Sequence, residues 1–341
     1  VLTFASAPDY ETQTSYTATV TVSDGTNSGT QDVTVNVSDL DDEAPVITSS
    51  DTFSADENQT AIGTVTATDA DNLDTSATTS FAVSGSELAI DSDGVLTFTS
   101  SPDYETKTSY TATITASDGA GNSSTQDITV SVNNLNDNSP VFSSGTSFSA
   151  DENQTAIGAV AASDADGDSV TYTASGSDIV IDNISGVITF SSAPDYETKT
   201  SFTSTVTATD GLNSSTQDIT IAVNNLNDNF PELVSIPTFT INENETEVGT
   251  ISATDADGDT LVYSISGTES AGLSIDPDSG ALTFIDPPDY ETKTSYNFTV
   301  GVNDGNSTTN FVNMVNIYLN NLNDNSPIFS SNDTFTVAEN D

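Results

Sequence analysis

The sequence predicts an all-β protein made of tandem, seven-stranded Greek-key β-sandwiches. Three observations lead to this fold class. Short segments alternate apolar and polar residues with a period of two, Asn- and Gly-rich breaks separate these segments, and the pattern recurs along all 341 residues. No segment of ordinary helix length shows a 3.6-residue period, so we expect no substantial helix.

The strands are clearest in the second half of each repeat. In YTATITA at 110–116, the Tyr, Ala and Ile residues share one face and the Thr residues share the other. The next segment continues the alternation with Ile128, Val130 and Val132. This composition and period are typical of half-buried antiparallel strands. A turn such as DGAGNSS at 118–124 joins two strands, and about seven strands fit in each repeat.

The repeats are long enough to be separate domains. Four Leu residues mark the joints at spacings of 95, 91 and 96 residues: Leu40, Leu135, Leu226 and Leu322. Such a period suits an independent domain rather than a solenoid unit. The predicted boundaries are the end of one repeat at 1–44, complete repeats at 45–139, 140–230 and 231–326, and the start of another at 327–341.

The charge balance excludes several classes of function. The chain has 52 acidic and 3 basic residues and a formal net charge of −49, which would repel nucleic acids and anionic lipid surfaces. Cys and His are absent, so disulfides, zinc sites and thiol or imidazole chemistry are excluded. The carboxylates fit a solvated surface or multivalent cation binding, and the regular strand pattern argues against a disordered acidic chain.

The joints have an unusual composition. NNLNDNSP at 133–140 returns as NNLNDNFP at 224–231 and NNLNDNSP at 320–327, with the more acidic SDLDDEAP at 38–45. These linkers supply oxygen donors, and their Pro fixes φ at the entry to the next repeat. EN, PDYET, DAD and an Asp-Gly turn recur in the predicted loops. If these loops meet at a joint, a divalent cation would relieve their mutual repulsion.

This motif set resembles that of the cadherin repeats, and the resemblance covers nearly the whole chain. The family pattern has a Glu after the first strand, D-x-E, a D-x-N-D-N linker, D-x-D and a late Asp-Gly turn. The resemblance implies about three calcium ions at each joint. The upper repeat would supply the first three motifs, and the lower repeat the last two.

The resemblance implies ligands from both sides of each joint. For 135–139 they are Glu57, Asp103, Glu105, Asn136, Asp137, Asn138, Asp164, Asp166 and Asp210. For 226–230 they are Glu152, Asp195, Glu197, Asn227, Asp228, Asn229, Asp255, Asp257 and Asp304. The first joint would use Asp9, Glu11, Asp41, Asp42, Glu43, Asp69, Asp71 and Asp118. The last joint has only an upper half, formed by Glu243, Asp289, Glu291, Asn323, Asp324 and Asn325.

Some positions depart from the family pattern. The leading Asp of the linker is kept only as Asp39, and elsewhere it is Asn134, Asn225 or Asn321. Asp168 and Asp259 are further candidate oxygen donors in the short loop after DAD. The absence of Trp removes support for the strand-exchange adhesion of vertebrate cadherins. The Thr-, Asp- and Gly-rich composition without Cys is similar to that of repeats in giant bacterial surface proteins.

The resulting hypothesis is a calcium-rigidified stalk or filament segment of a large extracellular adhesion or structural protein. The alternative is an array of carbohydrate- or partner-binding modules, for which the TESAGLSIDP insertion at 268–277 is the candidate. An enzyme is not expected, because the acidic pairs recur in every repeat and no unique catalytic cluster is present. Expected partners are calcium, other repeats and a cell-surface ligand such as a polysaccharide. No segment is apolar and long enough to insert into a membrane.

Three smaller interpretations concern single side chains. The repeated Tyr of PDYET should pack against its own loop, with carbohydrate stacking as the alternative. The three Lys residues share one position and should face solvent: Lys107, Lys199 and Lys293. The Asn-x-Ser/Thr sequences leave glycosylation open, with examples at Asn122, Asn213 and Asn306.

Overall fold

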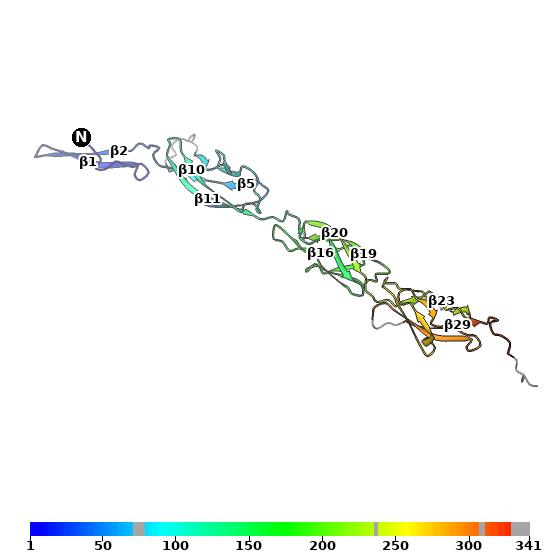
Figure 1. Ribbon diagram of the computed structural model, residues 1–341. Helices are drawn as coiled ribbons and strands as arrows, with labels where there is room; N and C mark the ends of the chain where they lie inside the picture. The colour runs from blue at the N-terminus through cyan, green and yellow to red at the C-terminus, as the bar shows by residue number, and fades with distance from the viewer. Residues whose placement is uncertain (71–78, 235–237, 307–310, 329–341) are drawn as a thin grey trace, which may run out of the picture. The chain divides into compact units, whose positions relative to one another are not determined.

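The computed structural model describes residues 1–70, 79–234, 238–306 and 311–328, and Figure 1 traces the chain. It contains two compact units, formed by Val1–Ser143 with Ala162–Thr171 and Ala208–Ser215, and by Ser144–Ala161 with Tyr172–Thr207 and Thr216–Asp341. Each predicted joint lies inside one unit. Within the described residues the only helix is the 3-10 turn η1 (Ser270–Gly272), and no helix has the length and hydropathy of a membrane span.

The repeat predicted at 45–139 confirms the all-β fold. Its described strands are β3 (Val46–Ile47), β4 (Thr52–Asp56), β5 (Ala61–Thr64), β6 (Ala67–Thr68), β7 (Ser80–Val83), β8 (Leu88–Ile90), β9 (Val95–Phe98), β10 (Ser109–Ser117) and β11 (Ser123–Asn133). The first two of the seven expected strands are each divided in two. The division occurs because β3 pairs with β6 while β4 and β5 join different sheets.

Two main sheets face each other in this repeat. One has the order β4-β11-β10-β7, with β4 parallel to β11 and the other neighbours antiparallel. The second has the order β5-β9-β8, and its β5–β9 register shifts between Ala61 and Gly63. Each sheet buries one side, as the alternating burial of β11 shows. The loops between strands therefore emerge at the two ends of the sandwich, where the acidic motifs lie.

The next two repeats have the same strand order. The first contains β12 (Val141–Phe142), β13 (Ser147–Asp151), β14 (Ala156–Ala159), β15 (Ala162–Ser163), β16 (Thr171–Ala174), β17 (Ile179–Ile181), β18 (Val187–Phe190), β19 (Ser201–Thr209) and β20 (Ser214–Asn224). The second contains β21 (Glu232–Leu233), β22 (Thr238–Asn242), β23 (Glu247–Thr250), β24 (Ala253–Thr254), β25 (Val262–Ser266), β26 (Leu273–Ile275), β27 (Ala281–Phe284), β28 (Ser295–Asn303) and β29 (Phe311–Asn320).

The first 44 residues form a single hairpin, β1 (Ser15–Ser23) and β2 (Ser28–Asn36), which corresponds to β10 and β11. The apolar side chains Val20 and Val22 are exposed there. Their counterparts Ile114 and Ala116 are fully buried in the complete repeat. Val20 and Val22 thus occupy positions that belong to the core of a complete repeat.

The cores consist of the predicted inward-facing residues. Ile128, Val130 and Val132 are buried together with Leu96 of the opposite sheet. A glycine in the turn before β18 allows this turn to approach the residue just after β14, the neighbouring strand of the same sheet. Gly186 has φ +69°, and a Cβ atom there would lie 2.3 Å from the carbonyl oxygen of Val160. Gly94 and Gly280 have the same role, so this contact is a general feature of the repeat.

Candidate metal centre

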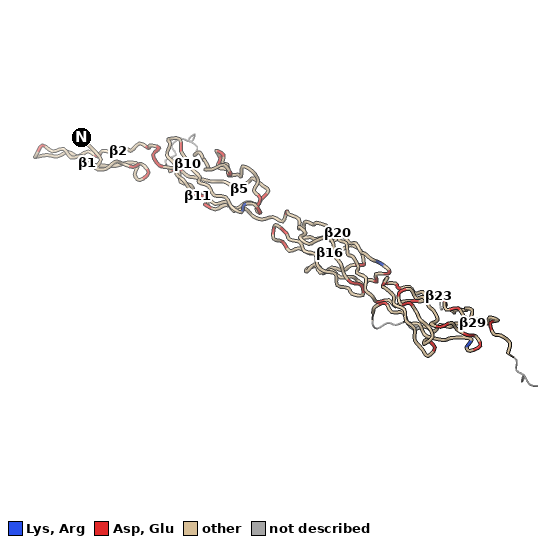
Figure 2. Tube along the Cα trace, in the orientation of Figure 1, with Lys and Arg blue, Asp and Glu red and all other residues tan. Residues whose placement is uncertain are grey.

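The acidic residues lie mainly on loops and turns, and Figure 2 marks their positions along the chain in red. One buried glutamate follows the first strand of each complete repeat. Glu57 is only 2% exposed, and its two oxygens accept hydrogen bonds from the backbone N–H groups of Leu135 and Tyr104, both at 2.8 Å. This carboxylate therefore joins the linker to the PDYET loop. Glu152 and Glu243 make the equivalent bonds.

The Asn of the EN motif has a role that the sequence analysis missed. Asn58 adopts a left-handed backbone conformation with φ +63°, which Asn tolerates better than most residues. Its amide nitrogen donates a hydrogen bond to Asp137 of the linker. Asn153 and Asn244 adopt the same conformation and donate to the linker Asp residues at 228 and 324.

The PDYET segment forms a tight turn that orients its two acidic residues. The backbone N–H of Lys107 donates to the carbonyl oxygen of Asp103 at 2.9 Å, which closes the turn. The Asp103 carboxylate accepts bonds from the backbone and hydroxyl of Thr106. At the next joint, the hydroxyl of Thr198 is the largest cause that lowers the pKa of Asp195. Asp195 is thus held in its charged form.

The second Asp of DAD binds the linker backbone from below. Asp166 accepts hydrogen bonds from the N–H groups of Asp137 and Asn138, at 3.0 and 2.8 Å. The leading linker residue Asn134 donates its amide to the carbonyl oxygen of Asp166, at 2.8 Å. The position where the family has Asp is therefore used here as a donor. Asp257 and Asn225 repeat this arrangement.

The late Asp-Gly turn also contacts the linker, through an Asn that the sequence analysis mentioned only as a glycosylation sequence. Asn213 donates its amide to the side-chain oxygen of Asn136 at 2.6 Å and to the carbonyl oxygen of Asn138 at 3.2 Å. The side-chain amides of Asn122 and Asn306 likewise donate to linker carbonyl oxygens, those of Asp41 and Asn227. These amides are engaged inside the joints and are unsuitable for attachment of a glycan.

Several buried oxygens at the joints accept no hydrogen bond from the described residues. Asp164 illustrates how they arise: its Oδ1 accepts N–H bonds that shape the loop, while its Oδ2 is buried without a donor. The same holds for Asp210. The full set of such joint oxygens is Asp39 Oδ1, Asp164 Oδ2, Asp210 Oδ2, Asn227 Oδ1, Asp255 Oδ2 and Asp259 Oδ2. All are acceptors, which is the donor set that a hard cation requires.

Carboxylates from one loop or from separate motifs lie close enough to share a cation. Groups whose oxygens fall within 4.8 Å of one another are Glu57–Glu105–Asp137, Glu152–Asp195–Glu197, Glu197–Asp228–Asp257, Asp164–Asp166–Asp168 and Asp41–Asp69–Asp118. Burial, followed by the charges of Glu57 and Asp166, raises the pKa of Glu105. Burial and three neighbouring carboxylates likewise raise the pKa of Asp259. Without a counter-charge, these clusters repel themselves.

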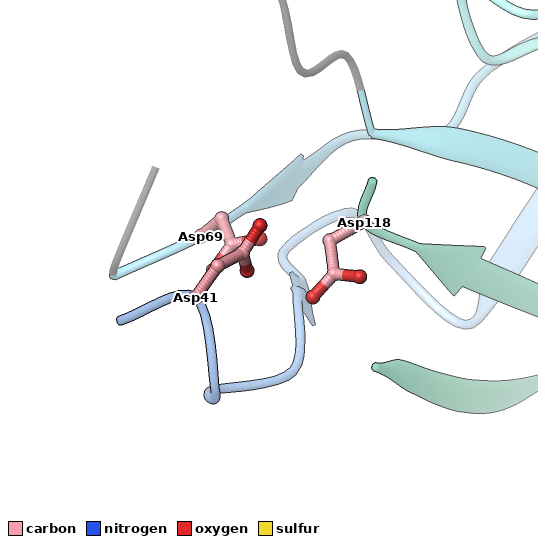
Figure 3. A group of neighbouring side chains, drawn as sticks. All are labelled: Asp41, Asp69 and Asp118. Atoms are coloured by element: carbon pink, nitrogen blue, oxygen red, sulfur yellow. The ribbon is translucent and has the colours of Figure 1, made fainter. Parts of the chain in front are cut away.

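The first joint brings most of its predicted ligands together. Figure 3 shows Asp41 of the linker beside Asp69 and Asp118 of the following repeat. On the preceding side, Asp9, Glu11, Asp42 and Glu43 line one hollow. The predicted ligand Asp71 lies outside the described residues.

The last joint shows the upper half that was predicted. Asp324 accepts the amide of Asn244 at 2.7 Å and that of Asn325 at 3.0 Å. Asp289 caps its own turn, and Glu291 accepts the amide of Asn321. Asn323 is exposed. The bonds of Asp324 repeat those of the complete joints, whereas the amide of Asn321 bonds to Glu291 and not to an aspartate carbonyl oxygen from below. Within the described residues no carboxylates face this half from below.

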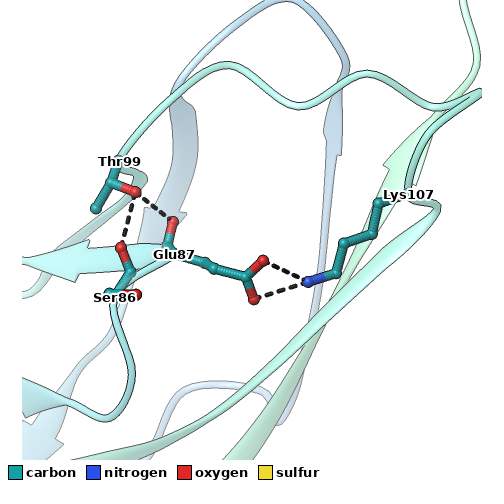
Figure 4. Close-up of polar contacts among 4 residues, drawn as sticks. All are labelled: Ser86, Glu87, Thr99 and Lys107. Atoms are coloured by element: carbon teal, nitrogen blue, oxygen red, sulfur yellow. Dashed lines mark hydrogen bonds and ion pairs between the residues drawn. The ribbon is translucent and has the colours of Figure 1, made fainter.

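The three Lys residues have specific partners, so the expectation that they simply face solvent was incomplete. Lys107 Nζ lies 2.6 Å from a carboxylate oxygen of Glu87, as Figure 4 shows, and 4.1 Å from the ring centre of Tyr110. Lys199 and Lys293 also pair with one acid and one aromatic ring. The acid partner of Lys293 is Glu269 of the 268–277 insertion, which is thereby fastened to its own repeat.

Comparisons with known proteins agree with this architecture. The "Cadherin domain" profile matches residues 51–133 and 237–319, and the "Bacterial Ig domain" profile matches 136–222. Protocadherin Fat 1 of Homo sapiens is 32% identical across 97% of the chain, and the protocadherin-like wing polarity protein stan of Drosophila melanogaster is 30% identical across 95%. The chain spans only 8% and 10% of these two relatives.

Solved structures support the same fold. The extracellular domain of protocadherin GammaB4 aligns over 96% of this chain and 58% of its own, with 25% identity and a TM-score of 0.69. Mouse cadherin-23 EC22-24 aligns over 82% of this chain and its whole length, with 23% identity and a TM-score of 0.67. Tandem β-sandwich repeats, matched profiles and relatives at this identity lead to one conclusion. The chain is a homologue of the cadherins and carries cadherin domains at 51–133 and 237–319.

Proposed function

We propose that the joints at 38–45, 133–140 and 224–231 bind calcium and that the chain is a calcium-stiffened segment of an extracellular adhesion or structural protein. The observation that carries this proposal is the set of buried joint oxygens without hydrogen-bond donors in the linkers and in the loops below them. Carboxylate groups such as Glu57–Glu105–Asp137 lie on the upper side of the same joints. The oxygen-only donor set, which contains no thiolate or imidazole, favours calcium over transition metals.

The proposed ligands follow the pattern of the joints. At 133–140, Glu57, Glu105 and Asp137 would hold a cation on the upper side, and Asp164 and Asp210 would hold one on the lower side. At 224–231, Glu152, Glu197 and Asp228 have the upper role. A bound cation would supply positive charge that removes the repulsion between these groups.

Stiffening would follow from the origin of the ligands. The backbone of the linker is already bound to Glu57 above and to Asp166 below. Additional bonds between the same loops would remove the remaining freedom of the linker. Isolated extracellular calcium modules bind with dissociation constants of about 10⁻⁴–10⁻³ M, so the sites would be filled outside a cell and empty in the cytosol. We place the protein at a cell surface on this basis, consistent with its cadherin homologues.

Calorimetric titration of the metal-stripped chain with CaCl₂ tests this proposal. We expect several cations per chain, with MgCl₂ binding much more weakly because Mg²⁺ gives up its water reluctantly. Asp210→Asn should remove a charged oxygen from the joint at 133–140 and lower the stoichiometry or affinity there. Asp182→Asn is the matched control, since Asp182 accepts hydrogen bonds within an exposed turn of the repeat and supplies no oxygen to a joint. An absence of calcium heat at millimolar concentration would refute the proposal.

A further inference from the structure

The outer face of the sheet β22-β29-β28-β25, in the repeat predicted at 231–326, differs from the same face of the two preceding repeats. Met314 is 62% exposed, Tyr318 49% and Val262 44% on this face. Among the described residues, no large apolar side chain is exposed on the strands of the sheets β4-β11-β10-β7 or β13-β20-β19-β16. The difference is therefore confined to one repeat.

The strand pairing identifies the residues that correspond. Met314 lies opposite Thr299, as Asp127 lies opposite Thr113. Tyr318 lies opposite Thr240, as Ser131 lies opposite Ser54. Met314 thus stands where the earlier repeat has a charged residue, and Tyr318 stands where it has a serine. The strand pairing is the same in both repeats.

This face also lacks the acidity of the rest of the chain. Strands β22, β25, β28 and β29 contain no Asp or Glu, whereas β11 and β20 carry Asp127 and Asp218. The polar strand residues beside the apolar ones are neutral, with Asn316 opposite Asn297 and Thr238. At one edge Glu269 accepts the backbone N–H of Asn297, and this carboxylate is paired with Lys293. Loss of charge together with exposed Met and Tyr is the composition of the centre of a protein–protein interface. A flat neutral surface on a chain of charge −49 is the place where a second copy can approach with least repulsion.

We propose that this outer face, centred on Asn316 between Met314 and Tyr318, is a self-association surface that packs against the same face of a second copy. The contact would be isologous, since one neutral patch meets itself. From ordinary strand spacing and rise, the face covers roughly 550 Å² per copy, or about 1,100 Å² in total. That area is just below the range of stable complexes, so the expected contact is weak and would gain strength from many copies on one surface.

The proposal is independent of calcium binding, because these side chains lie on strands and not at the joints. Sedimentation velocity of the full chain in calcium at 150 mM salt, up to several hundred micromolar, should show a concentration-dependent dimer. Met314→Asp with Tyr318→Ser, which restores the residues found at Asp127 and Ser131, should weaken the dimer at least tenfold. Val180→Asp, which removes an exposed apolar side chain elsewhere, should leave it unchanged.

A second measurement locates the contact directly. The chain has no Cys, so a single introduced thiol reports one position. Asn316→Cys should form a disulfide-linked dimer faster than Thr129→Cys, which occupies the corresponding site in an earlier repeat. Equal crosslinking rates, a monomeric chain at the highest concentration, or a dimer that the double variant does not weaken would each overturn the proposal. Unchanged circular dichroism and melting temperature of the variants would show that the fold is retained.

Discussion

Replacing Glu152 by Gln tests how the joint is built, because this side chain has two separate tasks. It is 2% exposed, and its oxygens accept N–H bonds from Leu226 and Tyr196, both at 2.7 Å. A Gln amide can accept only one of them and turns an NH₂ group towards the other donor. Bonds to a charged group contribute about 1.5–3 kcal/mol each. In chelator, the loss is partly offset because Glu152 no longer repels Glu197, so we expect a net destabilisation of about 1–2 kcal/mol.

Calcium should enlarge this difference. At 10 mM calcium and a dissociation constant of about 10⁻⁴–10⁻³ M, each bound ion stabilises the native chain by about 1.4–2.7 kcal/mol. The variant loses a ligand of the joint at 224–231 and should lose most of that gain. Hydrogen exchange of the β13–β20 strands, read by mass spectrometry with calcium and with chelator, reports the local opening free energy.

The control is Glu57→Gln, which changes the equivalent residue of the preceding repeat. It should shift exchange around β4 and β11 and leave the strands of the 140–230 repeat unchanged. If Glu152→Gln has the same effect in calcium as in chelator, the carboxylate stabilises the loops only through its hydrogen bonds. The assignment of Glu152 as a ligand would then be wrong.

Three further predictions follow from the turns and charges. Gly186→Ala should lower the free energy of unfolding by about 3–5 kcal/mol in thermal melts, because its Cβ would collide with a backbone carbonyl oxygen. Gly176→Ala has open space around it and should lower the same free energy by only about 1–2 kcal/mol, through backbone strain. Asn153→Gly keeps the left-handed backbone but loses the hydrogen bond to Asp228, so it should lower the free energy of unfolding by about 0.5–1.5 kcal/mol. Asn153→Ala should lower it further, because Ala also strains the left-handed backbone; equal losses for the two variants would contradict this. Burial and nearby charges raise the pKa of Glu105, so protons should compete with calcium at higher pH than for an ordinary Glu. Calcium titrations at a series of pH values should show the affinity beginning to fall above the range in which an ordinary Glu titrates, and a flat profile would contradict this.

The sequence predicted the repeat period and the inward-facing strand residues, and its resemblance to cadherin repeats implied that the acidic loops meet at the joints. These features were accessible because alternation is local and because the motifs return at one spacing. The donors that organise the joints were not predicted. Asn58 and Asn153 contact linker residues 79 and 75 positions away, and their left-handed backbone has no sequence signal apart from the Asn itself.

Two other features depend on the packing of distant segments. Lys107 pairs with Glu87 and Tyr110 only because two loops meet at the surface of the sandwich. The breaks that divide β3 from β4 and β5 from β6 arise where the chain crosses between sheets. Alternation predicts that a strand exists, but the sheet that it joins is decided by tertiary contacts.

The central claim is that cations at the joints restrict the motion between neighbouring repeats. Small-angle X-ray scattering of the full chain, in millimolar calcium and again in excess chelator, tests it most directly. We predict a single, well-defined maximum dimension with calcium and a broad distribution of dimensions after chelation. Superimposable curves under the two conditions would contradict the claim and would mean that proline and the linker hydrogen bonds alone set the joints.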